Sequence, residues 1–372
     1  MSYRGLTWDH PRGYNALAAA QAAGGPVHWE VQPLEGFESA PIADLCARYD
    51  LVVLDHPHLG EAVATNCLRP LDDLLPADRL AAIARDSIGP VFASYAMAGR
   101  QWALPLDAAT QVMALRPDLV ATVPATWAGV ADMAAGGGVA LSLAGPHAFL
   151  SLLSVCAALD PALDMADGGW PDQGTLSDAF TLLALIAAFS VHSVRALNPI
   201  GILDHMLCHD DVALVPLIYG YVNYSTPDLE NRIAFHDAPR IAGRPGSILG
   251  GTGIAVSSRV EVNAALSDHL LWLLGREAQC GFIPAHDGQP AHAAAWHDPT
   301  INSACGGFFA QTVETLQAAA IRPRHDGYIA FQAAASALVR RALDDGAAAA
   351  PTARAISDLF ARSLDGRKGP FR

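Results

Sequence analysis

Lysine is nearly absent from this sequence. The chain has 372 residues and a single lysine, Lys368, four positions before the C-terminal Arg372. A GxxxxGK[ST] phosphate loop uses its lysine to hold the β- and γ-phosphates, and a pyridoxal enzyme uses one to form a Schiff base. The sequence therefore excludes the phosphate-loop mechanism and argues strongly against pyridoxal chemistry.

Positive charge as a whole is scarce. There are 23 basic residues against 37 acidic ones, and the formal net charge is −14. Binding to nucleic acid needs clustered lysine and arginine side chains that replace the counterions around phosphates. We therefore expect no nucleic-acid partner.

Long apolar segments are also missing. No run of 18 or more apolar residues occurs, so we expect no membrane-spanning helix. The first residues contain no apolar segment of the kind that a secretory signal needs. We expect a cytoplasmic protein if Met1 is the native start, and a periplasmic protein if a signal was trimmed.

The cysteines are few and are scattered singly along the chain. Neither a CxxC pair nor any other paired spacing occurs, which predicts reduced thiols that pack as small apolar side chains. Such unpaired thiols weakly favour a cytosolic location. The six residues are Cys46, Cys67, Cys156, Cys208, Cys280 and Cys305.

The sequence does contain a clear alternation of strands and helices. At ~100–200 residues per domain, its length predicts two or three domains. We expect strands at residues 5–9, 27–31 and 50–55, with helices at 14–23 and 43–48. Uninterrupted apolar strands spaced by helices are typical of a parallel sheet covered on both faces. The predicted fold class is α/β, with the ligand bound where the strands end.

The later part of the chain continues this pattern. Because Pro105 interrupts the extended stretch 100–115, we expect two short strands joined at residues 105–107. The glycine-rich residues 250–253 are expected to form a flexible turn before a strand. Further strands are expected at 139–143 and 211–220, and helices from 127, at 149–159, 175–190 and 262–274, and from 307 onward.

Two histidine pairs raise the alternative of a metal-dependent hydrolase. His205 and His209 are spaced i, i+4, but the glutamate of an HExxH protease is missing. His56 and His58 have the form seen in the amidohydrolase superfamily, many members of which need a mid-chain lysine that this sequence cannot supply. The simpler interpretation is an exposed helix for the first pair and a helix-entry turn for the second.

Residues 250–253, Gly-Gly-Thr-Gly, match only part of a dinucleotide fingerprint. That fingerprint needs its glycine turn between a strand and a helix, whereas here the glycines precede a strand. Glycines in this position more simply allow the backbone to approach a ligand or a neighbouring segment closely. We therefore expect no nucleotide cofactor, and the sequence indicates no other cofactor.

Aromatic and acidic side chains gather at the predicted strand ends. Rings pack against the C–H faces of a sugar, while carboxylates and amides accept hydrogen bonds from its hydroxyl groups. The pattern predicts a polyhydroxylated ligand, although aromatic residues that merely cover the edge of the core would look the same. The residues are Trp8, Tyr219, Tyr221, Tyr224 and Trp296, with Asp9, Asp55, Asp107 and Gln289.

The order of these features resembles that of the solute-binding proteins of ABC importers, the family that includes maltose-binding and other sugar-binding proteins. Each motif is weak alone, but together they run in family order over nearly the whole chain. The motifs are residues 49–55 followed by Gly60, 68–73, 95–107, Pro-Ala-Thr-Trp at 124–127, 247–253, and Gly-Gln-Pro at 288–290.

The resemblance implies a two-lobe, periplasmic-binding-protein-like fold with the ligand cleft between the lobes. Lobe 1 would comprise residues 1–106 and 254–302, and lobe 2 residues 107–253 and 303–372. The protein would be a monomer without enzymatic activity that delivers a sugar or polyol to an ABC permease. The implied ligand contacts are Trp8, Asp9, His10, Asp55, His56, Asp107, Tyr219, Tyr221, Tyr224, Gly250, Gly251 and Thr252.

An anionic ligand is the remaining alternative within the binding class. A cytoplasmic binder or sensor of a carboxylate or phosphate would use Arg12, Arg322 or Arg324. Arginine is the only permanently charged cation away from the C-terminal end, so the choice between sugar and acid depends on these residues. Arg322 is therefore included among the expected ligand contacts.

Overall fold

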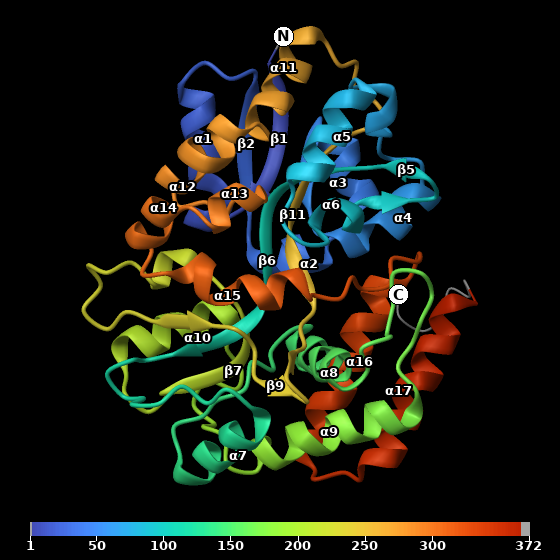
Figure 1. Cartoon of the computed structure of the whole chain (residues 1–372). Helices are drawn as coiled ribbons and strands as arrows, with labels where there is room; N and C mark the ends of the chain where they lie inside the picture. The colour runs from blue at the N-terminus through green and yellow to red at the C-terminus, as the bar shows by residue number, and fades with distance from the viewer. Residues whose placement is uncertain (1, 366–372) are drawn as a thin grey trace.

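The molecule consists of two lobes, one above the other, joined by strands that run through the centre (Figure 1). The computed structural model describes residues 2–365, so Lys368 lies outside the described residues. A single seven-stranded sheet has the order β2-β1-β3-β11-β6-β7, and β8 also pairs with β6. The α/β prediction is confirmed.

The upper lobe is built on parallel strands. β1 (Tyr3–Trp8) lies between β2 (Val27–Gln32) and β3 (Leu51–Leu54), parallel to both. Every residue of β3 is buried, because the helices on the two faces of the sheet exclude water from it. Helices α1 (Pro11–Ala22) and α3 (Ile42–Arg48) connect these strands, close to their predicted positions.

Strand β6 (Leu104–Leu115) belongs to both lobes. Its first half pairs antiparallel with β11 (Leu249–Val256), and its second half pairs with β7 (Leu214–Tyr219) and β8 (Ala234–His236). All 12 of its residues are buried. The sheet therefore continues from one lobe into the other without a break.

Two predictions about these central strands are wrong. Pro105 does not divide the chain into two short strands. Thr252 pairs with Asp107 and Gly253 with Pro105, so Leu106 is an extra residue of β6 at which the register shifts, and the ladder continues past the missing N–H donor. Residues 250–253 do not form a turn but lie inside β11. The glycines are needed there because Gly251 has a φ of +92° and because neighbouring groups leave no room for a side chain at Gly250.

The predicted strand at residues 139–143 is also wrong. This segment makes one parallel bridge, between Val139 and Leu214, and has no further ladder. The Ala140 N–H donates to the Leu214 carbonyl at 2.9 Å. Its apolar residues are buried beside β7. A short buried segment has the same run of apolar residues as a buried strand, although this one does not join the sheet.

Helices surround the lower lobe. α9 packs against α8 and α17, and α16 lies between α8 and α17 (Figure 1). Thr126, Asp172 and Asn198 cap three of these helices, each by accepting a hydrogen bond from the backbone N–H three residues ahead. The bounds are α7 (Trp127–Gly136), α8 (His147–Leu159), α9 (Gln173–Ala187), α10 (Pro199–Cys208), α15 (Phe308–Gln317), α16 (Tyr328–Asp344) and α17 (Ala349–Leu364).

The remaining elements are shorter or lie on the surface of the upper lobe. They are α2 (Leu34–Ser39), α4 (Leu59–Ala64), α5 (Ala77–Asp86), α6 (Val91–Ser94), α11 (Ala264–Leu273), α12 (Ile283–Ala285), α13 (Ala293–Trp296) and α14 (Pro299–Ala304). The short strands are β4 (Ala96–Met97), β5 (Arg100–Gln101), β9 (Arg240–Ile241) and β10 (Arg244–Pro245). Tight 3-10 turns are η1 (His56–His58), η2 (Leu71–Asp73) and η3 (Val222–Tyr224), and η4 (Ala278–Phe282) is a wider π-helical turn. Within residues 2–365, no helix is both long and apolar enough to cross a membrane.

Candidate functional site in the cleft between the lobes

A small cleft lies where the strand ends of the two lobes face each other. It encloses about 50 Å³, which is room for a few water molecules. Both lobes contribute to its walls, because β1, β3 and α2 approach from one side and β7 and α8 from the other. The lining residues are Trp8, Arg12, Leu34, Phe37, Glu38, Asp55, Ala109, His147, Tyr219, Tyr221, Gly250, Gly251 and Thr252.

Aromatic rings form one wall of the cleft. Trp8, at the end of β1, is 2% exposed and stacks on His10 with a centroid separation of 5.5 Å. Tyr221 meets both rings edge to face, at 5.9 Å from Trp8 and 4.8 Å from His10. Burial, followed by the positive charge of Arg12, lowers the pKa of His10 to about 4, so this imidazole is neutral at pH 7. The wall therefore offers uncharged aromatic faces.

A buried ion pair lies beside this wall. Arg12 donates from Nε to Asp107 Oδ2 at 2.8 Å and from Nη2 to Asp107 Oδ1 at 2.5 Å. Its third contact is Nη1 to the Gly220 carbonyl at 3.1 Å, and its guanidinium carbon lies 4.9 Å from the Tyr221 ring centroid. Burial lowers the pKa of Arg12, but Asp107, Tyr221 and Tyr219 together raise it above its usual value. Arg12 thus remains charged, and its charge is matched by Asp107.

A second buried ion pair lies behind the lining residue Asp55. Arg322 donates from Nη2 to Asp55 Oδ2 and to the Leu249 carbonyl, and from Nη1 to Gln332. Burial raises the pKa of Asp55, but Arg322 and His56 together bring it below its usual range. Burial, followed by the charge of Arg322, lowers the pKa of His56 to about 4. The second arginine of the cleft is therefore also neutralised by a carboxylate of the same chain.

Glu38 and His147 meet across the cleft. Glu38 lies on α2 of the upper lobe, and His147 is the first residue of α8 in the lower lobe. Glu38 Oε1 lies 3.2 Å from His147 Nε2, and the His147 ring meets the Tyr219 ring at a centroid distance of 5.8 Å. The His147 side chain is 2% exposed, and neither ring nitrogen has a well-aligned hydrogen bond among the described residues. Neither residue was predicted from the sequence, although Gly-Pro-His at a helix start was a usable signal for His147.

The hydroxyl group of Tyr219 is buried at the cleft without a hydrogen-bond partner in the part of the chain that the structure describes. Nε of Arg322 and the hydroxyl group of Tyr328 also lack partners in this part of the chain, but neither residue lines the cleft. A buried polar group without a partner is costly, so the Tyr219 hydroxyl group is suited to donate a hydrogen bond to a bound molecule.

The structure brings together about half of the expected site residues. Trp8, Asp55, Tyr219, Tyr221, Gly250, Gly251 and Thr252 line the cleft. His10, His56, Asp107 and Arg322 lie directly behind this lining, where they stack on it or pair with it.

Four expected residues lie elsewhere. Asp9 is exposed to solvent. Tyr224 donates to Asp204 at 2.7 Å, and the Trp296 indole N–H donates to the Pro290 carbonyl at 2.8 Å. Gln289 is fully buried and bonds to the backbones of Val222 and Ala108. The polar groups of the last three are satisfied within the protein, so these residues stabilise the fold around the cleft.

The alternative residues have other partners. Arg324 donates to the backbone carbonyls of Ala93, Ser94 and Ala96, so it does not face a ligand. His205 Nε2 lies 2.6 Å from Asp211 Oδ1, and its ring stacks on that of His209 at 4.3 Å. Within residues 2–365, no group of three or more His, Cys, Asp or Glu side chains is placed to hold a metal ion.

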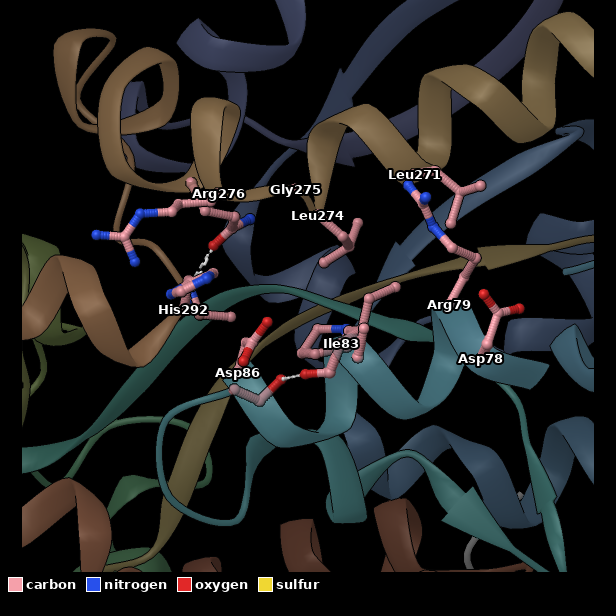
Figure 2. Close-up of a pocket in the computed structure, with 14 residues that line it drawn as sticks. Asp78, Arg79, Ile83, Asp86, Leu271, Leu274, Gly275, Arg276 and His292 are labelled. Atoms are coloured by element: carbon pink, nitrogen blue, oxygen red, sulfur yellow. Dashed lines mark hydrogen bonds between the residues drawn. The ribbon is translucent and has the colours of Figure 1, made fainter. Parts of the chain in front are cut away.

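A larger groove, of about 310 Å³, lies on the upper lobe between α5 and α11. Figure 2 shows Ile83 and Asp86 on one wall and Leu271, Leu274 and His292 on the other. Only one lobe contributes to it, and its charged residues are not held in buried pairs. We regard the smaller inter-lobe cleft as the candidate site, because buried aromatic and charged groups converge there from both lobes.

Comparison with known proteins yields structures but no sequence relatives. No protein-family model matches, and no curated protein is similar in sequence. A ribitol complex of an ABC transporter solute-binding protein from Agrobacterium radiobacter K84 matches with 19% identity and a TM-score of 0.77, covering 99% of this chain and 98% of that one. Maltose-bound MalE3 of T. maritima matches with 15% identity and a TM-score of 0.77, covering 97% and 99%.

A third structure extends the comparison to another polyol complex. The solute-binding protein of Agrobacterium vitis S4 with bound D-mannitol matches with 14% identity and a TM-score of 0.73, covering 99% of both chains. At these identities the likeness concerns the fold, and it spans the whole chain. The protein therefore has the two-lobe fold of the solute-binding proteins of ABC transporters.

Proposed function

We propose that the protein binds a small, neutral, polyhydroxylated solute in the inter-lobe cleft and has no catalytic role. The observation that carries this proposal is the pairing of both cleft arginines with carboxylates of the same chain, beside the aromatic wall of Trp8 and Tyr221. Proteins of the same fold have been solved with ribitol, D-mannitol and maltose. Their ligands are neutral and rich in hydroxyl groups.

The charges of the cleft support a neutral ligand over an anion. A carboxylate or phosphate would have to compete with Asp107 for Arg12, or with Asp55 for Arg322. It would also meet Glu38 at the cleft wall. An unpaired charge in a buried site is expensive, so an anionic ligand would gain little from arginines that are already occupied. Carboxylates and hydroxyl groups already in place suit the hydroxyls of a polyol.

The small volume of the cleft favours a small solute, such as a single sugar unit or a linear polyol, over a long oligosaccharide. A cleft enclosing about 50 Å³ must open before such a molecule enters and then close around it. We propose that this motion bends β6 and β11, and that the Glu38–His147 contact forms on closure because it joins the two lobes. The corresponding lobe limits are residues 1–106 with 254–302, and 107–253 with 303–372.

We further propose that the protein works as a monomer with an ABC permease outside the cytoplasmic membrane. The fold neighbours described as ABC transporter solute-binding proteins support this role.

Ligand screening tests the proposal directly. Ribitol, D-mannitol and maltose are added to the full chain at increasing concentration, with citrate and inorganic phosphate as anionic comparisons, and the melting temperature is recorded. A ligand at 100 times its Kd stabilises the native state by about 2.7 kcal/mol, so binding raises the melting temperature measurably. Titration calorimetry then gives the affinity. Stabilisation by the anions alone would contradict the proposal.

A further inference from the structure

Two cysteines of the upper lobe lie in contact although they are 21 positions apart. Cys46 is on α3 and is 3% exposed, and Cys67 follows α4 and is half-buried. Cys67 packs against the apolar cluster to which Cys46 belongs, and each thiol shifts the pKa of the other. This cluster also includes Leu45 and Leu59. The structure therefore joins two thiols that the sequence spacing left separate.

Backbone contacts hold the two cysteines in place. The Ser257 hydroxyl donates to the Cys46 carbonyl at 2.9 Å, and the Ser258 N–H donates to the Cys67 carbonyl at 2.8 Å. These two serines are consecutive residues at the end of β11. Arg259 adds a bond from Nε to the Cys46 carbonyl at 3.0 Å. One short segment thus anchors both cysteine backbones, which keeps the thiols adjacent.

The environment also divides the roles of the two sulfurs. Interaction with Cys46 lowers the pKa of Cys67, which favours its thiolate form. The same interaction, followed by burial, raises the pKa of Cys46. Cys67 is the more accessible and more nucleophilic sulfur, while Cys46 is held behind it as the resolving thiol.

We propose that Cys46 and Cys67 form a reversible intramolecular disulfide when the protein meets a disulfide oxidant, such as oxidised glutathione. The Cys67 thiolate attacks one glutathione sulfur, forms a mixed disulfide and releases the other glutathione as a thiolate. Cys46 then loses its proton and attacks the Cys67 sulfur, which releases the second glutathione. The protein loses two hydrogen atoms, and one glutathione disulfide is reduced to two glutathione thiols.

The bond would close a loop that contains β3 and Asp55 of the cleft wall. A cross-link over about 20 residues restricts the unfolded chain and so stabilises the native state. Neither cysteine lines the cleft, so the formation of the disulfide does not depend on which ligand the cleft binds. The proposal is therefore independent of the proposed binding function.

The test uses the full chain with its six cysteines. The protein is equilibrated with glutathione mixtures of increasing oxidised fraction, quenched with an alkylating agent and examined by intact mass and peptide mapping. We expect disulfide formation in the unmutated protein to remove two hydrogen atoms, or about 2 Da. After quenching, the oxidised protein should carry two fewer alkyl groups than the reduced protein and should yield a peptide that links Cys46 to Cys67. We also expect the oxidised protein to melt roughly 5 °C higher than the reduced one.

Three variants separate this disulfide from other oxidation. Cys67→Ser should lose the linked peptide, and Cys46→Ser should leave glutathione on Cys67. Cys208→Ser, which changes an exposed cysteine, should keep the link. The peptide map of the unmutated protein remains decisive even if a variant fails to fold. Full alkylation of both cysteines in oxidised glutathione, a persistent glutathione adduct on Cys67, or links between other cysteines would overturn the proposal.

Discussion

At the scale of single residues, the arginines determine how the cleft can be interpreted. The scarcity of lysine made Arg12, Arg322 and Arg324 the residues on which a choice between sugar and acid depended. The structure gives Arg12 and Arg322 carboxylate partners and gives Arg324 three backbone carbonyls. Their charges maintain the architecture of the cleft, so their removal should affect stability first.

We predict that Arg12→Ala destabilises the protein by about 3–5 kcal/mol, because it leaves the Asp107 carboxylate buried without its partner. Chemical denaturation measures the free energy of unfolding. The matched control is Arg85→Ala, which removes an exposed arginine paired with Asp86 and should change stability by less than about 0.5 kcal/mol. Similar small losses for both variants would show that the Arg12 pair contributes little.

Tyr219→Phe tests the proposed ligand contact. The change removes only the hydroxyl group, which has no protein partner among the described residues, so the melting temperature of the free protein should fall little. The Kd for the polyol that binds should rise about tenfold, the equivalent of one hydrogen bond of roughly 1.4 kcal/mol. Tyr14→Phe, on α1 outside the cleft lining, serves as the control in the same calorimetric titration. An unchanged Kd in Tyr219→Phe would exclude this hydroxyl from the contact.

Cleft residues could be predicted from the sequence where local structure places them, but not where the packing of the two lobes does. Trp8, Asp55 and Tyr219 were predicted because a strand end fixes where the next side chains point. Glu38 and His147 were missed because their meeting depends on how two lobes pack, which no local pattern encodes. Gln289, like Trp296 and Tyr224, was assigned to the ligand because a polar or aromatic side chain in a loop gives no sign of an internal partner.

At the scale of elements, strand β11 has the most demanding geometry. Gly251 has a positive φ in the middle of a paired strand, opposite Ala108. A Cβ atom there would lie 2.5 Å from the Asp107 carbonyl oxygen, so this strand approaches β6 more closely than side chains allow. Neither feature is visible in the sequence, where glycines next to a strand suggest a turn.

The Gly251→Ala variant should therefore lose more stability than the strain of a positive φ alone would cost. Gly24 provides the matched comparison, because its φ is +95° and no atom lies within 4 Å of the position that a Cβ atom would take. We expect Gly24→Ala to cost about 1–2 kcal/mol from backbone strain, and Gly251→Ala to cost clearly more. Urea denaturation compares the two. Equal losses would mean that the backbone of β6 yields easily at Asp107.

The order and type of most elements followed from the sequence, but their pairing did not. Helix starts such as Trp127, after its Thr126 cap, were predicted because capping is a local interaction. The strand containing Pro105 and the non-strand at residues 139–143 were assigned wrongly, because the neighbouring strand decides whether a segment pairs. Long-range hydrogen bonding is the information that a single sequence lacks.

At the scale of the whole molecule, two buried histidines link stability to pH. Burial is the first cause that lowers the pKa of both His10 and His56 from 6.5 to about 4, followed by Arg12 and Arg322 respectively. In the unfolded chain these two histidines take up protons below about pH 6.5, whereas in the folded protein they stay neutral until about pH 4. Stability that is fully present above pH 6.5 should therefore fall as the pH decreases from 6.5 towards 4.

Urea denaturation at pH 7.5 and pH 5 measures this loss, whose upper limit over that interval is on the order of 2 kcal/mol for each histidine. His10→Asn is the informative variant, because asparagine can still cap α1 and carries no titrating group. The variant should lose less stability between the two pH values than the unmodified protein. An identical pH dependence would show that His10 does not contribute.

The continuous ladder through β3, β11, β6 and β7 has a thermodynamic consequence for unfolding. A fold whose halves were joined by flexible linkers would melt as two independent units. Here β6 pairs with β11 at one end and with β7 at the other, so unfolding either half breaks hydrogen bonds that the other half needs. We expect scanning calorimetry to show one transition with equal van't Hoff and calorimetric enthalpies, while two resolved peaks would contradict this coupling. A protein built to bend at its centre would then also melt as one cooperative unit.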